Sequence, residues 1–134
     1  LPFLQEVLGT FSFLPLVVSE CEDADVAHVL DVVWDDSQTL IVVSTDLSHF
    51  QSYARAREID EVTSNAILAL RPEWIGEGQA CGRLPVRGLL HCASARQLQP
   101  ELLYLRNSGD TAGPRDRVVG YGAYRFLPKT RRSE

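Results

Sequence analysis

Two short apolar runs, each rich in β-branched residues, dominate the N-terminal part of this chain. Phe11–Val18 and Thr39–Thr45 have the length and composition of buried strands, although Pro15 places the first at a sheet edge or marks a bend. The acidic stretch between them favours a helix start, and a helical stripe of apolar residues follows it: Val26, Val29, Leu30 and Val33. This strand–helix–strand order predicts parallel strands with a right-handed crossover, and a helix packed on the sheet.

Three further helices are predicted from spacing and from helix-terminal residues. A proline in the first turn and Gly9 at the end favour a short helix over Pro2–Leu8. A longer amphipathic helix over Ser52–Leu70 stops before Pro72. The last helix has Pro85 in its first turn, and its apolar positions are Val86, Leu89, Leu90 and Ala93.

The C-terminal part predicts two strands, Leu102–Arg106 and Val118–Phe126, joined by a glycine-rich loop. A turn is predicted earlier in the chain, at Asp35–Ser37. Gly120 and Gly122 share one face of the last strand, so we expect a helix or an aromatic ring to approach it closely. Residues 128–134 are expected to be a solvated tail. The predicted fold is α/β, a sheet of parallel and antiparallel strands flanked by helices.

Composition and charge narrow the function classes. The chain has 134 residues, 45% of them hydrophobic and 23% charged, which suits one globular domain. Its formal charge of -5 argues against general binding to nucleic acid or to anionic membranes. No apolar run approaches the roughly 18 residues of a membrane span. A small-molecule or peptide ligand, or another protein, is the expected partner.

The chain has three cysteines: Cys21, Cys81 and Cys92. A small, odd number of cysteines does not indicate a disulfide framework. Odd counts are commonest where thiols stay reduced, so we expect a cytoplasmic protein. The first residues, Leu1–Leu4, lack the basic region and cleavage site of a signal peptide. We expect the chain to be part of something longer.

An acid and an imidazole three residues apart, Asp46 and His49, follow the second apolar run. Groups at the carboxyl end of a strand line ligand crevices in open α/β sheets, so both side chains are expected in one pocket. The alternative is structural: Asp46 caps the next helix while His49 bonds a carbonyl. The spacing does not decide between these two interpretations.

Cys81 is placed at or just before the start of the helix that contains Pro85, where the helix dipole and Arg83 both favour thiolate over thiol. The alternative is a small buried apolar residue. If it is functional, we expect Cys81 within roughly 10 Å of Asp46 and His49, the span of a small ligand site. His28 is predicted to be a solvent-facing or capping histidine, and His91 and Cys92, inside the helix body, are predicted to have no role in the site.

Five segments, in this order and at these separations, resemble the Memo-like family, whose microbial members are called AmmeMemoRadiSam system protein B: Leu1–Leu4, Ser44–Phe50, Ala80–Arg83 with Pro85, Asn107–Asp110 and Arg117–Tyr121. The resemblance covers nearly the whole chain. The family's fold is similar to that of class III extradiol dioxygenases, which hold a non-haem metal with two histidines and an acid. The resemblance therefore implies a dioxygenase-like metal pocket.

Carried over residue by residue, the resemblance makes Cys81 the metal ligand where the dioxygenases place a carboxylate. It makes His49 the acid/base histidine, with Asp46 as its neighbour. Non-haem iron is the implied metal, with copper or zinc as alternatives that also suit a thiolate. The family's two metal-binding histidines precede the segment at which this chain starts. Residues 1–134 are thus expected to be the C-terminal part of one Memo-like domain, with weak or no metal binding alone.

Three functions follow from these observations. The first is metal-dependent oxidation in a dioxygenase-like pocket. Because Cys81 replaces a carboxylate there, we expect this pocket to be altered or vestigial. The second is a non-catalytic scaffold that binds a peptide or a small ligand in the same pocket. The third, implied only by the microbial family's name, is an accessory role beside a radical S-adenosylmethionine protein.

Overall fold

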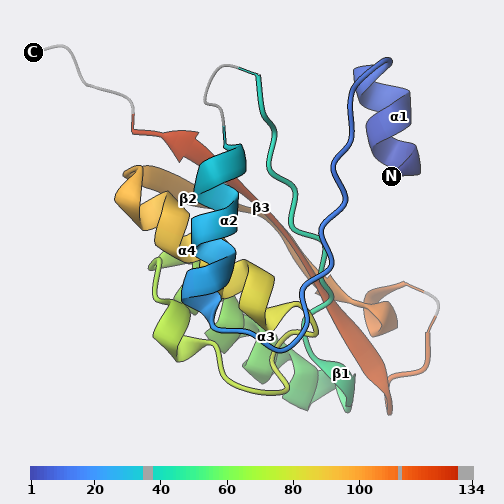
Figure 1. Cartoon of the computed structure of the whole chain (residues 1–134). Coiled ribbons are helices and arrows are strands. Elements are labelled where there is room, and N and C mark those ends of the chain that lie inside the picture. The colour runs from blue at the N-terminus through green and yellow to red at the C-terminus, as the bar shows by residue number, and fades with distance from the viewer. Residues whose placement is uncertain (35–37, 112, 130–134) are drawn as a thin grey trace, which may run out of the picture.

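A computed structural model describes residues 1–34, 38–111 and 113–129. Four helices and three strands carry the fold (Figure 1). In chain order the elements are α1 (Pro2–Leu8), α2 (Asp23–Val33), β1 (His49–Gln51), α3 (Tyr53–Leu68), a 3-10 turn (Pro72–Trp74), α4 (Arg83–Ala95), β2 (Leu98–Asn107), a 3-10 turn (Ser108–Asp110) and β3 (Val118–Pro128). No helix in the described ranges is both long and apolar enough to cross a membrane.

The sheet is antiparallel, in the order β1-β3-β2. β2 and β3 form the long hairpin that their sequence predicted, with Leu98 opposite Pro128 and Asn107 opposite Gly120. The short strand β1 pairs with the start of β3, where His49 lies opposite Val119. The sheet therefore brings β1 to the end of β3 from which the hairpin loop emerges.

The two N-terminal strand predictions are wrong, and so are the parallel strands and the crossover derived from them. Neither Phe11–Val18 nor Thr39–Thr45 is a strand; Figure 1 shows both as connections. A strand needs a neighbour for its backbone hydrogen bonds, and the sheet built from the described residues offers none to these two segments. Their apolar side chains are consequently left exposed in large part: Phe13, Leu14, Leu16, Val17, Leu40 and Val42.

The helix predictions are confirmed, including the bounds of α1 and the first-turn position of Pro85 in α4. The stripe on α2 packs against α4, however, and not on the sheet as predicted. Val26 and Leu30 are buried against Leu89 and Cys92 of α4, whereas Val29 stays 43% exposed. Close helix packing explains the difference, because a Cβ on Gly88 would overlap the Val26 side chain.

The second core cluster joins α3, α4 and the hairpin. Ala66 and Ile67 of α3 meet Val86 and Leu90 of α4, with Phe126 of β3 packed beside them. α4 therefore contributes to both core clusters and links α2 to the rest of the fold. The predicted turn at Asp35–Ser37 lies outside the described residues, as do residues 130–134 of the tail. Pro128 belongs to β3, so the predicted tail begins too early.

A charged group also joins α2 to α4. Arg87 Nε donates to Asp23 Oδ2 at 2.7 Å, and His91 Nε2 lies 3.3 Å from the same oxygen. Burial tends to raise the pKa of Asp23, but the hydrogen bond with His91 and the Arg87 guanidinium outweigh it and leave that pKa below its usual range. Asp23 therefore stabilises the fold in its ionised form.

This arrangement predicts a pH-dependent contribution to stability. Because the folded-state pKa of Asp23 is depressed, its contribution is complete above the unfolded value of about 3.9 and is lost as the pH falls through the folded value. Asp23→Asn should lower the free energy of unfolding by about 1.5 kcal/mol at pH 7, from the loss of a charged hydrogen-bond acceptor. Urea denaturation at neutral and acid pH would show this difference shrinking in acid.

Asp31→Asn is the matched control on the same helix. Its carboxyl pairs with Arg96 at 2.9 Å but is 69% exposed, so its loss should change stability by less than about 1 kcal/mol. An Asp23→Asn effect that stayed the same at acid pH would contradict the linkage.

Candidate functional site

Residues 46–49, the site segment, are fixed by their two central residues. The Leu47 N–H donates to Gly120 O at 2.9 Å, and the Gly120 N–H donates to Ser48 O at 2.8 Å. Leu47 and Ser48 are 2% and 0% exposed. With the central pair buried, Asp46 and His49 at either end both reach the surface.

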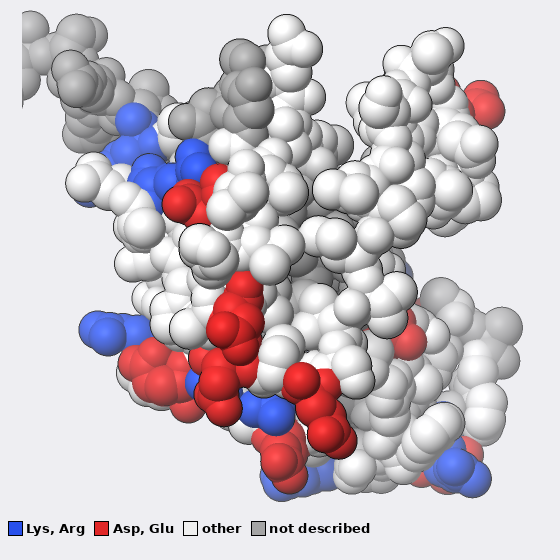
Figure 2. Space-filling model, in the orientation of Figure 1, with Lys and Arg blue, Asp and Glu red and all other residues white. Residues whose placement is uncertain are grey.

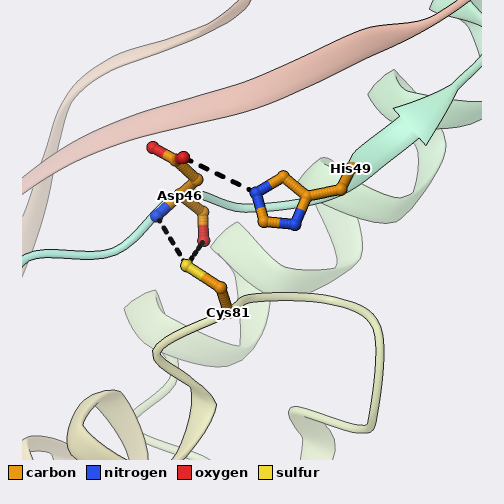
Figure 3. Close-up of side chains that lie close together, drawn as sticks. All are labelled: Asp46, His49 and Cys81. Carbon is orange, nitrogen blue, oxygen red and sulfur yellow. Dashed lines mark hydrogen bonds and ion pairs between the residues drawn. The ribbon is translucent and has the colours of Figure 1, made fainter.

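Asp46 and His49 then meet on one side of the segment. His49 Nε2 lies 3.5 Å from Asp46 Oδ2, and the two side chains are 35% and 49% exposed, the histidine being the more covered (Figure 3). The capping alternative for Asp46 is wrong, because α3 begins after Ser52. Placing the proton of a neutral His49 on Nε2, toward this carboxylate, would leave Nδ1 with its lone pair free, as a base or as a metal donor.

Cys81 arrives from the other side, immediately before Gly82, the N-cap of α4. Its sulfur accepts the Asp46 N–H at 3.3 Å, and its own N–H donates to Asp46 O at 3.3 Å. The sulfur also lies 3.4 Å from Thr45 Oγ1. Cys81 is exposed, so the alternative of a small buried apolar residue is wrong.

The three side chains form one cluster. The candidate donor atoms of Asp46, His49 and Cys81 all lie within 4.8 Å of one another (Figure 3). This confirms the predicted convergence, although the chemical roles assigned to the three residues stay predictions. Donor atoms around a tetrahedral ion are separated by about 3.5 Å, so small side-chain rotations suffice to place a metal among them. A thiolate, an imidazole and a carboxylate suit zinc, iron or copper.

The other histidines and cysteines do not join this cluster. His28 is exposed on α2, and His91 bonds Asp23. Cys92 is buried, its sulfur donates to Ala27 O at 3.2 Å, and burial raises the pKa of its thiol. None of these three residues contributes a donor atom to the cluster.

Two supporting residues were missed by sequence reasoning. Thr45 Oγ1 accepts the Gly82 N–H at 2.7 Å, and a side chain on Gly82 would overlap Thr45. Asp60 of α3 is 3% exposed and accepts the Ser48 N–H at 2.9 Å. Burial raises the pKa of Asp60, and the hydrogen bond from Ser48 counteracts it. Asp60 lies one helical turn after Ala56, on the face of α3 that packs in the core. An acid at such a position is the sequence signal that could have identified it.

The outer edge of the site carries a strained aromatic residue. Phe50 has a φ of 57°, in the left-handed region that bulky side chains rarely adopt, and its ring is 63% exposed. The ring lies 5.7 Å from that of His49, and the Arg117 guanidinium lies 4.8 Å from its centroid. Strain of this kind clusters at functional sites because the surrounding structure has to enforce it.

The sulfur environment predicts the order in which the cysteines react. Alkylation by iodoacetamide at neutral pH should label Cys81 first, because its sulfur is exposed and is oriented by the Asp46 N–H. Cys21, also exposed, should follow, and Cys92 should be slowest. One unit of pKa alone changes the thiolate fraction about tenfold, and burial adds to the protection of Cys92. Peptide mapping by mass spectrometry gives the rates, and faster labelling of Cys92 than of Cys81 would contradict this order.

Comparison with known proteins places these residues in a wider group. A family model described as Memo-like protein matches residues 1–125. A MEMO1 family protein of Methanosarcina acetivorans is 32% identical over 92% of this chain and 51% of its own length. Those of Aquifex aeolicus and Metallosphaera sedula are 33% and 27% identical, over 95% and 94% of this chain and 52% and 49% of their own lengths. The chain thus spans about half the length of these curated relatives.

Proposed function

Because this chain belongs to the Memo-like family, we propose that Asp46, His49 and Cys81 are one part of a dioxygenase-like, non-haem metal site that other residues of a longer protein complete. The observation that carries this proposal is the cluster itself. Three potential metal donors, from the site segment and from the start of α4, lie within 4.8 Å of one another.

The proposed roles of Cys81, His49 and Asp46 follow from the chemistry of their side chains. Cys81 is the metal ligand, since a thiolate binds soft and borderline metals firmly and its sulfur is already oriented by the Asp46 N–H. His49 accepts and returns a substrate proton at Nδ1, because Asp46 Oδ2 holds the proton on Nε2. A bound iron, copper or zinc ion would supply Lewis acidity, and iron or copper would also supply redox chemistry.

The cluster by itself is open and incomplete. A catalytic zinc site usually has three protein ligands. Here the proposed roles assign His49 and Asp46 to proton transfer, which leaves Cys81 as the one ligand among the three clustered residues. Many apolar residues of segments 11–18 and 39–45 are also exposed, and Figure 2 shows mostly uncharged surface over α1 and the segment that follows it. Since the relatives are about twice as long, we infer that their remaining half supplies both the cover and the missing ligands.

A metal titration tests this proposal. The 134-residue chain should bind Fe²⁺ or Zn²⁺ weakly under reducing conditions, and a longer protein with the N-terminal half of a Memo-like domain should bind much more tightly. Cys81→Ser in that longer protein should weaken binding on the order of 10- to 100-fold, because the softer donor is lost.

Cys21→Ser is the matched control, since it removes an exposed thiol outside the cluster and should leave the affinity unchanged. Equal affinities for the chain, the longer protein and its Cys81→Ser variant would show that Cys81 is not a ligand. That outcome would favour the alternative, a non-catalytic scaffold that binds a peptide or small ligand. The exposed Phe50 ring under the Arg117 guanidinium would then be its natural contact surface.

A further inference from the structure

Asp60 is a buried acid to which the proposed chemistry assigns no role. It lies in the body of α3, where the other buried side chains are uncharged, and it is 3% exposed. A carboxyl group in such a place is costly unless it is hydrogen-bonded. Its Oδ1 accepts the Ser48 N–H at 2.9 Å, a bond buried between α3 and the site segment.

The strand opposite is shaped to admit this carboxyl. A Cβ on Gly120 of β3 would overlap both oxygens and the carboxyl carbon of Asp60. The same Gly120 forms backbone hydrogen bonds with Leu47 and Ser48. Asp60 and Gly120 therefore hold the central pair of the site segment from two sides, and a residue larger than glycine would push them apart.

We propose that Asp60 is a positioning residue for the site: its carboxyl fixes the backbone at Ser48 and thereby directs Asp46 and His49 toward Cys81. Ser48 lies one residue before His49 and two after Asp46, so a shift of its amide moves both side chains. The Asp46 backbone also moves, and with it the N–H and the carbonyl that bond Cys81. This inference rests on the proposed metal site for its functional readout, but its geometric part can be tested alone.

The experiment compares Asp60→Ala and Asp60→Asn in the 134-residue chain. Co²⁺ is titrated under reducing conditions, and the sulfur-to-cobalt charge-transfer absorption reports binding at Cys81. Amide hydrogen exchange at Leu47, His49 and Gly120 reports the order of the segment. Asp60→Ala should weaken Co²⁺ binding by about 10- to 100-fold, as loss of supporting hydrogen bonds does at metal sites, and should speed exchange at these amides. Asp60→Asn keeps an oxygen acceptor and should retain most of the affinity.

Thr63→Ala controls for general destabilisation. Thr63 is fully buried on the same helix, and its hydroxyl bonds only Ile59 O among the described contacts. It should lower stability while leaving cobalt affinity and the three amides as in the unaltered chain. If Thr63→Ala and Asp60→Ala lose affinity equally, or if Asp60→Ala loses none, the positioning role is overturned.

Gly120→Ala displaces the same carboxyl by a second route. The substitution keeps Asp60, but the added Cβ pushes its carboxyl away. Its control is Gly122→Ala on the same strand, where the three atoms nearest to a Cβ all belong to Tyr124, the first at 2.6 Å. Gly120→Ala should reproduce the Asp60→Ala effect and Gly122→Ala should not, and the reverse would contradict the proposal. If the longer protein used in the metal titration also shows no sulfur-to-cobalt absorption, the proposed metal site fails. The hydrogen-exchange comparison then decides on Asp60 by itself.

Discussion

Three hydrogen bonds around Leu47 and Ser48 determine whether this chain has a site at all. Two of them tie the pair to Gly120 of β3, and the third ties Ser48 to Asp60 of α3. Each hydrogen bond satisfies a buried backbone polar group, and leaving such a group without a partner would cost about 1–3 kcal/mol. Because they fix a segment of four residues at its centre, the residues at its two ends have little freedom in where they point.

The Cys81 side of the cluster depends on similarly short-range bonds. The Cys81 sulfur accepts the Asp46 N–H, and the Cys81 N–H donates to Asp46 O. The hydroxyl of Thr45 accepts the N–H of Gly82. The start of α4 is therefore attached directly to the residue that also faces His49. The hydrogen bond from the Asp46 N–H orients the sulfur, which would reduce the cost of ordering it if it binds the proposed metal.

The sequence predicted the local parts of this arrangement well. Helix periodicity and terminal prolines gave α1, α3 and α4, because those signals act within a few residues. The Asp-x-x-His spacing and the position of Cys81 left structural alternatives open, and the resemblance to the Memo-like family grouped the three residues into one site. The strands at Phe11–Val18 and Thr39–Thr45 were predicted wrongly, because strand formation depends on a partner that lies elsewhere. Asp60 was missed for a related reason: only the folded chain shows that Ser48 lies beside it.

The central claim is that Cys81 binds a metal together with residues that this chain does not itself supply. X-ray absorption at the metal edge tests it most directly, on a zinc-loaded longer protein that includes this chain. The account predicts one sulfur scatterer at about 2.3 Å beside nitrogen or oxygen donors, and its loss in the Cys81→Ser variant. A shell of nitrogen and oxygen alone in the unaltered protein, or a sulfur that persists after Cys81→Ser, would contradict it.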